Sequence, residues 1–386
     1  MKILVDPQIF SQQTYGGISR YYTEIFSEIK KRKDIQVILP IYYTDNFYLK
    51  TTDLLSKNKL LTSVYDLLSF FKISTKTLRR KKTEKFLTQV CQGNNYDVFV
   101  PTYYNPYFLD LITEKPFVLT VYDMIHELFP QYFSDDPYRV TENKKKLIYK
   151  ATRIIAVSHN TKKDILAIFP DLDPEKIHVI HHGSSIKIDV NTKVNLPANY
   201  ILYVGSRADY KNFKLLVNAI NPILKENPDL VLLAAGGGEF SEEEINFIQK
   251  LDLGKQIKQT TFEENELGHF YKNAEFFVFP SQYEGFGIPV LESMACGCPI
   301  ILSDSGSFPE VAGDAGIYFD SMSEDDLRTK IKMLLDDEDM RTQFSGKGLE
   351  QVKKFDWKVA AEQCLEVYRG AIEDKKNEIN NINDKL

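Results

Sequence analysis

The segment from Phe279 to Pro299, FPSQYEGFGIPVLESMACGCP, limits the possible folds of this chain more than any other stretch. An apolar run ends at Phe279, a turn with Gly285 and Gly287 follows, and a helical pattern begins at Pro289. Proline suits the first turn of a helix, because its missing N–H would have no partner within the helix. A strand, a glycine turn and a helix in this order predict one unit of a parallel α/β sheet. The turn leaves backbone N–H groups free to bind an anion such as a phosphate.

Two carboxylates bracket this turn, Glu284 in the loop and Glu292 in the first turn of the expected helix. Ionised carboxylates accept hydrogen bonds, so both can bind the hydroxyl groups of sugars. Together with amides that hold a diphosphate, they indicate a site for a sugar nucleotide. The alternative is that Glu292 only stabilises the start of a helix and that Glu284 is a solvated loop residue.

Apolar strand-like runs alternate with helical patterns along the chain, from Ile3–Val5 to Ile300–Leu302, which we expect to be the last core strand. This alternation predicts an α/β protein with two doubly wound parallel sheets, one in each half. A chain of 386 residues exceeds what a single core usually holds, which also favours two domains. The segment Lys187–Pro197 contains few large apolar residues and is the expected linker.

Two cations follow the strand-like run Tyr200–Val204. The chain passes through Gly205 and then carries Arg207 and Lys211 at the expected start of a helix. Arginine through its planar fork and lysine as a point charge would neutralise a diphosphate at this strand end. The alternative is two surface cations in a loop.

In the first half, the strand-like run Phe117–Val121 leads to Asp123 and His126. The carboxyl end of a strand is where an open α/β sheet binds ligands, and titratable groups there are functional candidates. A lone histidine is nonetheless more often a structural residue. Tyr103 and Tyr104 follow an earlier strand, where aromatic rings either stack on sugars or pack beneath a loop.

Composition excludes several functional classes. The net charge of −6 argues against a nucleic-acid-binding surface as the main function. The N-terminus lacks the apolar region of a signal peptide, and nothing approaches the apolar length of a transmembrane helix. Four cysteines without zinc-type spacing predict reduced, structural thiols in a cytoplasmic protein. The Lys72–Lys85 region is rich in cations, and it either lies on an anionic membrane or is a solvated helix face.

The sequence EGFGIPVLESMACG, which begins at Glu284, resembles the signature of the retaining glycosyltransferases of family 4. The segment GGISRYY, which begins at Gly16, is similar to the first loop of that family. The resemblance covers most of the chain and is strongest from residue 199 to residue 310. It implies the GT-B fold, in which two Rossmann-like doubly wound parallel-sheet domains face each other across a cleft.

The resemblance also implies a division of the chain. An N-terminal acceptor-binding domain would span residues 1–187, and a C-terminal nucleotide-sugar-binding domain would span residues 188–368. A helical tail, 369–386, would return toward the first domain. The segment Trp357–Ile372 resembles the helix with which GT-B enzymes make this return.

Residue roles follow from the same resemblance. Glu284 would hold a hydroxyl of the donor sugar and Glu292 the ribose, while Arg207 and Lys211 would stabilise the leaving nucleoside diphosphate. His126 matches a histidine that the family places near the donor sugar, and it completes the implied catalytic set. The residues implied to bind the donor are Gly16, Gly17, Gly205, Gly285, Phe286, Gly287, Ile288 and Glu292. The residues implied to contact the acceptor are Tyr103, Tyr104 and Asp123.

The implied reaction moves a hexose from a nucleotide-diphosphate sugar, such as GDP-mannose or a UDP-hexose, to a hydroxyl of a glycan or an undecaprenyl-type lipid-linked glycan. The anomeric configuration would be retained. The expected setting is bacterial surface polysaccharide synthesis (O-antigen, capsule or exopolysaccharide), in the cytoplasm or peripherally on the inner face of the plasma membrane.

We expect neither a metal ion nor a cofactor. An Asp-x-Asp pair occurs at Asp171–Asp173, but it follows Phe169-Pro170 in an expected turn between helices rather than at a strand end. No residue stands out as a dedicated nucleophile, which favours front-face substitution within one ion pair. Two alternative functions are a GT-B-type sugar-nucleotide epimerase or hydrolase, and a non-catalytic subunit that binds a nucleotide sugar.

Overall fold

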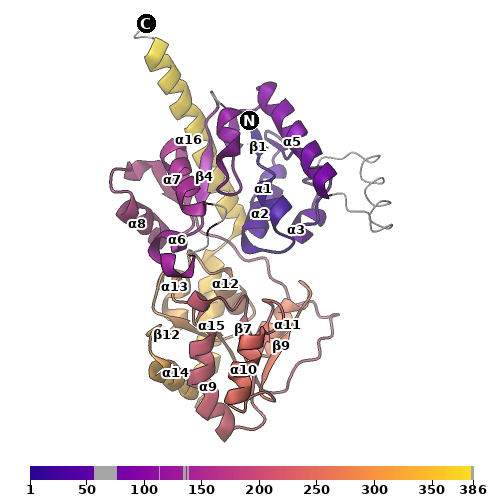
Figure 1. Ribbon diagram of the computed structural model, residues 1–386, viewed down its shortest axis with the longest axis vertical. Coiled ribbons are helices and arrows are strands. Elements are labelled where there is room, and N and C mark those ends of the chain that lie inside the picture. The colour runs from indigo at the N-terminus through magenta and orange to yellow at the C-terminus, as the bar shows by residue number, and fades with distance from the viewer. Residues whose placement is uncertain (56–75, 113, 134–135, 137–138, 384–386) are drawn as a thin grey trace. The chain divides into compact units, whose positions relative to one another are not determined.

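The computed structural model describes residues 1–55, 76–112, 114–133, 136 and 139–383 (Figure 1). The chain divides into two compact units. Unit 1 comprises residues 1–157, 161–182 and the chain from 357 onward, and unit 2 comprises residues 158–160 and 183–356.

Unit 1 contains short parallel strands. Its strands are β1 (Lys2–Val5), β2 (Gln36–Ile38), β3 (Val98–Val100), β4 (Val118–Val121), β5 (Arg153–Ala156) and β6 (Ile177–Val179). They pair in the orders β2-β1-β3 and β4-β5-β6. A parallel bridge from Phe99 to Phe117 links the two groups, so the full order is β2-β1-β3-β4-β5-β6. This order reverses between β1 and β3, and ligands of such sheets bind beyond the carboxyl ends of the strands at a reversal.

The helices of unit 1 cover these strands. They are α1 (Gln8–Gln12), α2 (Gly17–Lys30), α3 (Phe47–Lys50), α5 (Lys76–Gln92), α6 (Ile125–Leu128), α7 (Val140–Lys150), α8 (His159–Ile168) and α16 (Trp357–Asn383).

The last helix, α16, belongs to unit 1 from its first residue. Trp357 is buried and packs against Tyr21 of α2, with ring centres 6.0 Å apart. Cys364 is fully buried and its Sγ lies 3.7 Å from the Tyr21 hydroxyl. Residues 357–368 therefore group with unit 1, whereas the domain division implied by the resemblance placed them in the C-terminal domain. The first three turns of α16 pack their apolar side against α2, and this contact places them in unit 1.

Unit 2 contains one six-stranded parallel sheet with the order β12-β11-β10-β7-β8-β9. Its strands are β7 (Tyr200–Val204), β8 (Val231–Ala235), β9 (Ile257–Thr260), β10 (Phe276–Phe279), β11 (Ile300–Ser303) and β12 (Gly316–Phe319). Every residue of β7, β8, β10 and β11 is buried, as expected for parallel strands covered on both faces. Read from β9, the order is third, second, first, fourth, fifth and sixth strand of the unit. This is the doubly wound order of dinucleotide-binding sheets, and it reverses between β7 and β10.

The expectation that Ile300–Leu302 is the last core strand is wrong. Strand β12 follows it in the chain and pairs with β11 in parallel. It has only four residues, GIYF, and it begins with glycine directly after a helical turn. So short a run has no pattern that separates a strand from a loop.

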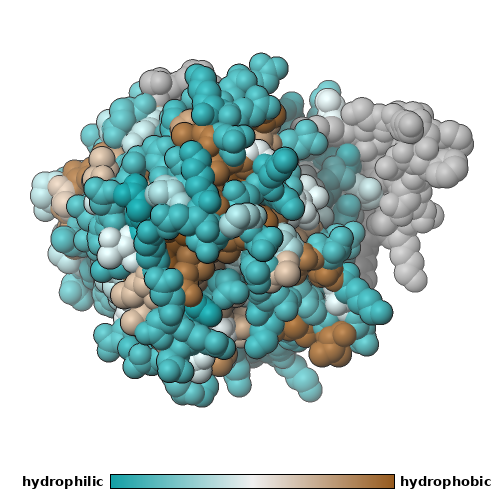
Figure 2. Space-filling model, turned by 90° about the horizontal axis from the view of Figure 1, so that it is seen from below, coloured by the Kyte–Doolittle hydropathy of each residue, from teal (hydrophilic) through white to brown (hydrophobic). Residues whose placement is uncertain are grey.

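The helices of unit 2 pack on both sides of its sheet. They are α9 (Phe213–Glu226), α10 (Glu242–Lys250), α11 (Leu267–Asn273), α12 (Ile288–Ala295), α13 (Phe308–Ala312), α14 (Glu324–Asp336) and α15 (Glu338–Gln351). Helix α9 shows why they pack: Leu216, Ile220 and Ile223 recur at helical spacing and are buried in the core with Val278 of β10. On the face drawn in Figure 2, hydrophobic residues are interspersed among hydrophilic ones, as on ordinary protein surfaces.

Candidate active site

The loops after β7 and β10 bring Lys211 and Glu284 together at the point where the strand order of unit 2 reverses. The Lys211 ammonium donates a hydrogen bond to Glu284 Oε1 and forms an ion pair with it. The two side chains are 14% and 16% exposed, so the pair is largely enclosed but still reachable. Lys211 Nζ also lies 5.3 Å from the centre of the Phe279 ring, at the end of β10. At the carboxyl edge of this sheet, a cation and an acid are thus in direct contact.

The loop that carries Glu284 is held by the loop after the neighbouring strand β11. Ser307 Oγ donates to the carbonyl oxygens of Glu284 (3.1 Å) and Phe286 (2.8 Å). A Cβ added to Gly306 would lie 2.9 Å from the Glu284 carbonyl, so the two loops touch. Ser307 could not be predicted from the sequence, because a serine in a small-residue turn gives no sign of which loop it contacts. These contacts fix the backbone on which Glu284 stands.

Gly287 directly precedes helix α12 and lies in the left-handed region, with φ at +90°. A Cβ there would lie 3.0 Å from the Phe308 ring, so both conformation and space require glycine. Phe286 is buried and can offer only its backbone to a ligand. Gly205, at the end of β7, is also left-handed, but its N–H already donates to the Ala235 carbonyl at 3.0 Å. The predicted contacts of these residues with the donor stay predictions.

Glu292 is buried, with 4% of its surface exposed. Helix α12 begins at Ile288, one residue before the expected start, so Glu292 is its fifth residue and lies beyond the first turn. Its Oε2 accepts a hydrogen bond from the Tyr271 hydroxyl at 3.1 Å. Burial, followed by the nearby Glu292, raises the pKa of Tyr271 well above its ordinary value, so the tyrosine keeps its proton and donates. The predicted contact of Glu292 with a ribose stays a prediction.

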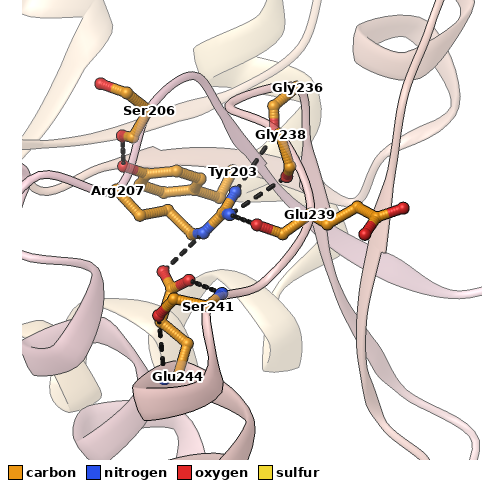
Figure 3. Close-up of polar contacts among 8 residues, drawn as sticks. All are labelled: Tyr203, Ser206, Arg207, Gly236, Gly238, Glu239, Ser241 and Glu244. Atoms are coloured by element: carbon orange, nitrogen blue, oxygen red, sulfur yellow. Dashed lines mark hydrogen bonds and ion pairs between the residues drawn. The ribbon is translucent and has the colours of Figure 1, made fainter.

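Arg207 has different hydrogen-bond partners from Lys211 (Figure 3). Its Nε donates to Glu244 Oε1 at 2.6 Å, and its side chain is only 5% exposed. Its Nη atoms donate to the carbonyls of Gly236, Gly238 and Glu239 at 3.2, 3.1 and 2.8 Å. The guanidinium therefore binds the glycine turn after β8. Its predicted contact with a diphosphate stays a prediction.

In unit 1, His126 lies on the short helix α6 after β4. Its ring packs on Phe133, with centres 4.1 Å apart. Its Nδ1 is buried and has no hydrogen-bond partner among the residues described. Burial, followed by the charge of Lys144, lowers the pKa of His126, so the imidazole is neutral at pH 7. Asp123 accepts a hydrogen bond from the Ile125 N–H at 3.1 Å and thereby stabilises the start of α6.

Lys144 of α7 is a fully buried lysine that our sequence analysis did not single out. Its ammonium donates to Glu127 Oε2 at 2.9 Å and to the Asp123 carbonyl at 3.1 Å. It also lies 5.1 Å from the centre of the Tyr104 ring. It is the first of three consecutive lysines, and the next two are exposed, so the sequence alone does not reveal which one points inward.

The aromatic loop after β3 is partly structural. Tyr104 is buried, and its hydroxyl accepts a hydrogen bond from the Tyr122 N–H at 3.1 Å. Tyr103 is less buried, and burial followed by the charge of Asp123 raises its pKa to about 12. Of the two rings, Tyr103 is the better placed to meet a ligand.

Asp6, at the end of β1, is a third residue that the sequence did not single out. Its carboxylate is fully buried at the strand-order reversal of unit 1. It accepts hydrogen bonds from the Tyr107 hydroxyl, the Gln8 N–H (3.2 Å) and the Thr102 N–H (3.4 Å). Burial raises its pKa from 3.8 to about 6 although these donors oppose the shift. Gly16 precedes α2, and a Cβ added to it would lie 2.4 Å from Oε1 of the flexible Gln13 side chain, which would have to move aside.

Models of known protein families match parts of both units. A family model described as Glycosyltransferase Family 4 matches residues 15–186, and one described as Glycosyl transferases group 1 matches residues 185–351. Together the two models cover every strand of both units except β1 (Lys2–Val5).

The chain belongs to the family 4 glycosyltransferases.

Among curated relatives of this glycosyltransferase is the O-antigen chain mannosyltransferase B of Escherichia coli. The two are 26% identical over 371 residues, which cover 92% of this chain and 96% of that protein. A second relative is the N-acetylgalactosamine-N,N'-diacetylbacillosaminyl-diphospho-undecaprenol 4-alpha-N-acetylgalactosaminyltransferase of Campylobacter jejuni, 28% identical over 232 residues, 58% of this chain and 62% of that protein.

Solved structures establish the GT-B fold of the glycosyltransferase. Sucrose-phosphate synthase from Thermosynechococcus elongatus matches with a TM-score of 0.71 at 18% identity, over 96% of this chain and 98% of that chain. HepE from Anabaena in complex with UDP and glucose matches with a TM-score of 0.66 at 18% identity, over 95% of this chain and 98% of that chain.

The basic region of the glycosyltransferase is only partly described, because Lys72 to residue 75 lie outside the described residues. In α5, Arg79 pairs with Asp45 at 2.9 Å and lies 4.7 Å from the centre of the Tyr43 ring, so it is a packing residue. Arg80 is 71% exposed. In the described part of the chain, no helix combines the length and apolar character needed to cross a bilayer.

Proposed function

We propose that this glycosyltransferase moves a sugar from a nucleoside-diphosphate sugar to a hydroxyl of a glycan or lipid-linked glycan, with retention of the anomeric configuration. The observation that carries this proposal is the Lys211–Glu284 pair at the strand-order reversal of unit 2, next to the start of α12. A related fold, HepE, has been crystallised with UDP and glucose. The O-antigen mannosyltransferase relative makes GDP-mannose the first donor to test, ahead of UDP-hexoses.

In this proposal the residues of unit 2 stabilise the charges that develop during transfer. The bond between the anomeric carbon and the diphosphate oxygen breaks, so the leaving diphosphate gains negative charge. Lys211 and the N–H groups at the start of α12 are aimed at that charge before the reaction. Glu284 accepts hydrogen bonds from donor-sugar hydroxyls, and its partner Lys211 offsets its repulsion of the diphosphate. We propose that these groups act without a metal ion.

The acceptor hydroxyl then bonds to the anomeric carbon on the same face, and its proton passes to the departing phosphate oxygen. This front-face course is consistent with retention. In unit 1, neutral His126 is proposed to hydrogen-bond the donor sugar, and Tyr103 to stack on the acceptor. The undecaprenol-linked acceptor named for the Campylobacter relative supports a lipid-linked glycan as one acceptor class.

Product analysis tests the proposal and separates it from its rivals. The protein is incubated with GDP-mannose, UDP-glucose or UDP-galactose, with and without lipid-linked glycan extracts, and products are identified by mass spectrometry. Transfer to the glycan supports the proposal, and NMR of the new linkage gives its anomeric configuration. Free sugar or an epimerised donor without acceptor would instead indicate a hydrolase or an epimerase.

Single substitutions test whether the Lys211–Glu284 pair takes part in the reaction. Lys211→Ala should lower the transfer rate by about 10²- to 10³-fold, the usual effect of removing one preorganised charge-stabilising donor. Lys214→Ala is the matched control, because Lys214 is an exposed lysine of α9 whose nearest partner, Glu243, is 3.5 Å away. Equal losses of transfer rate in both variants would show that Lys211 has no specific role in the reaction.

A further inference from the structure

Tyr271 on α11 is a buried tyrosine whose hydroxyl reaches the neighbouring helix α12. Its side chain is fully buried, and the hydroxyl donates to Glu292 Oε2 at 3.1 Å. The ring packs edge-on against Phe277 of β10, with ring centres 5.3 Å apart and ring planes at 87°. A tyrosine has few rotatable bonds, so this packing leaves the hydroxyl little freedom to move. Burial also keeps it protonated, because it raises the pKa of Tyr271.

Glu292 depends on such a donor because it is an acid in a buried place. Only 4% of its surface is exposed, and burying a carboxylate is costly unless hydrogen bonds replace the lost water. Glutamate has a long, flexible side chain, so a fixed donor at Oε2 also limits the directions in which its carboxylate can point. A carboxylate offers about four acceptor positions, so it can accept from Tyr271 and from other donors at the same time.

The position of Glu292 along the chain matches the chemistry of the proposed donor. A nucleoside-diphosphate sugar carries its sugar and its ribose at opposite ends of the diphosphate. Glu284 lies in the loop before α12, Gly287 directly precedes the helix, and Glu292 is its fifth residue. An acid for the sugar, a turn for the diphosphate and an acid for the ribose therefore follow one another in a single loop and helix.

We propose that Tyr271 is a positioning residue of the donor site, whose hydroxyl aims the Glu292 carboxylate at the ribose hydroxyls of the nucleotide. The inference rests on the proposed function, in which the donor carries a ribose, and on the ribose contact predicted for Glu292. It also assigns a class of donor. The site favours ribonucleotide sugars over deoxyribonucleotide sugars, such as those of deoxythymidine diphosphate.

Tyr271→Phe tests the inference, since it removes one oxygen and keeps the ring. Isothermal titration compares the tightest-bound of GDP, UDP and ADP with its 2′-deoxy and 3′-deoxy analogues. In the wild type, loss of a ribose hydroxyl should weaken binding by about tenfold, the value of one hydrogen bond to a charged group. In Tyr271→Phe this ratio should fall to about twofold, because a carboxylate without a fixed direction forms that bond only part of the time. An equal or larger ratio in Tyr271→Phe overturns the inference.

Tyr200→Phe is the matched control. Tyr200 of β7 is also fully buried, and its hydroxyl donates to the carbonyl of Phe270, the residue before Tyr271, at 2.7 Å. The control therefore removes the same oxygen and a hydrogen bond to the same helix, but no contact with Glu292. Its ratio should stay within about twofold of the wild-type value, because the carboxylate keeps its donor. An equal fall in both variants would show a general loosening of α11 and would overturn the role of Tyr271.

The effect of Tyr271 should depend on the carboxylate. In a Glu292→Ala background nothing remains for Tyr271 to aim, so Tyr271→Phe should then change the ratio by less than about twofold. A full fall in that background would show that Tyr271 acts by another route.

The wild-type titrations separate this inference from the proposed function. If the wild type binds none of the three nucleotides, the proposed function fails and this inference fails with it. If the wild type binds them but does not discriminate against the deoxy analogues, the inference alone fails.

Discussion

The charged residues at the two strand-order reversals lie in different surroundings. In unit 2, Lys211 and Glu284 form an ion pair with each other at the edge of the sheet. In unit 1, no cation among the described residues forms an ion pair with Asp6, and neutral donors hold its buried carboxylate. Burial without a counter-ion favours the protonated acid.

The raised pKa of Asp6 predicts a pH dependence of stability. A folded pKa of about 6 against 3.8 when unfolded means that the folded state holds its proton more tightly. The contribution to stability is fully present below pH 3.8 and is lost as the pH rises through about 6. Its size is on the order of 3 kcal/mol.

Asp6→Asn should remove this contribution, because an amide does not titrate. The difference in free energy of unfolding between the wild type and Asp6→Asn should therefore shift against the wild type as the pH rises from about 4 to about 7. Urea unfolding at both pH values measures it. A difference that does not vary with pH would contradict the assigned pKa.

At the scale of elements, helix α7 holds helix α6 through one buried ion pair. Lys144 reaches from α7 to Glu127 and to the carbonyl of Asp123, and it lies over Tyr104 of the aromatic loop. The segment that carries His126 is thus tied to the loop that carries Tyr103. Both segments hold residues predicted to meet the substrates.

Lys144→Met should destabilise the protein by about 3–5 kcal/mol, because it leaves Glu127 buried without its counter-ion. Lys145→Met, at an exposed position on the same helix, should change stability by less than about 0.5 kcal/mol. Chemical denaturation measures both. In a Lys144→Met, Glu127→Gln double variant, part of the loss should return, since the uncompensated charge is gone. Full additivity of the two changes would argue against a direct pair.

The start of helix α12 depends on a single glycine. Gly287→Ala should cost about 1–3 kcal/mol, because alanine at φ +90° is strained and its Cβ meets Phe308. Gly346→Ala is the matched control: an added Cβ within α15 has nothing within 4 Å and should stabilise the helix by about 0.5–1 kcal/mol. Thermal unfolding compares the two variants. Equal stability in both would show that the turn adapts to a side chain.

At the scale of the molecule, the two units have sheets of different order, each with a reversal. The reversal of unit 1 lies between β1 and β3, next to Asp6 and the aromatic loop. That of unit 2 lies between β7 and β10, next to Lys211 and Glu284. Each unit thus supplies one set of candidate ligand-binding loops.

The sequence left open whether the Lys72–Lys85 region lies on an anionic membrane, and the described part of α5 allows a test. Lys81 and Lys85 of α5 are exposed, and each cation near an anionic membrane contributes about 1 kcal/mol. A Lys81→Glu, Lys85→Glu variant should therefore bind phosphatidylglycerol vesicles more weakly in a sedimentation assay. Lys145→Glu, Lys146→Glu on α7 is the control of equal charge change. Wild-type protein that stays in the supernatant, or equal loss in both variants, would refute the contact.

The amino-acid sequence by itself determined the buried central strands, the glycine turns and the family of this protein. Parallel strands buried on both faces must be apolar throughout, and β7, β8 and β10 can be read directly for that reason. Lys211 and Glu284 follow two such strands, so their place at a strand end was predictable.

Only the tertiary structure decided which side chains meet. Arg207 and Glu244 are 37 positions apart, and Lys144 and Glu127 are 17 apart, on elements whose packing sets the contact. Nothing local marks Lys144 as buried among three lysines, or β12 as a strand in four residues. Burial, ion pairing and strand order depend on which distant segments pack together, and the sequence pattern of one segment does not contain that information.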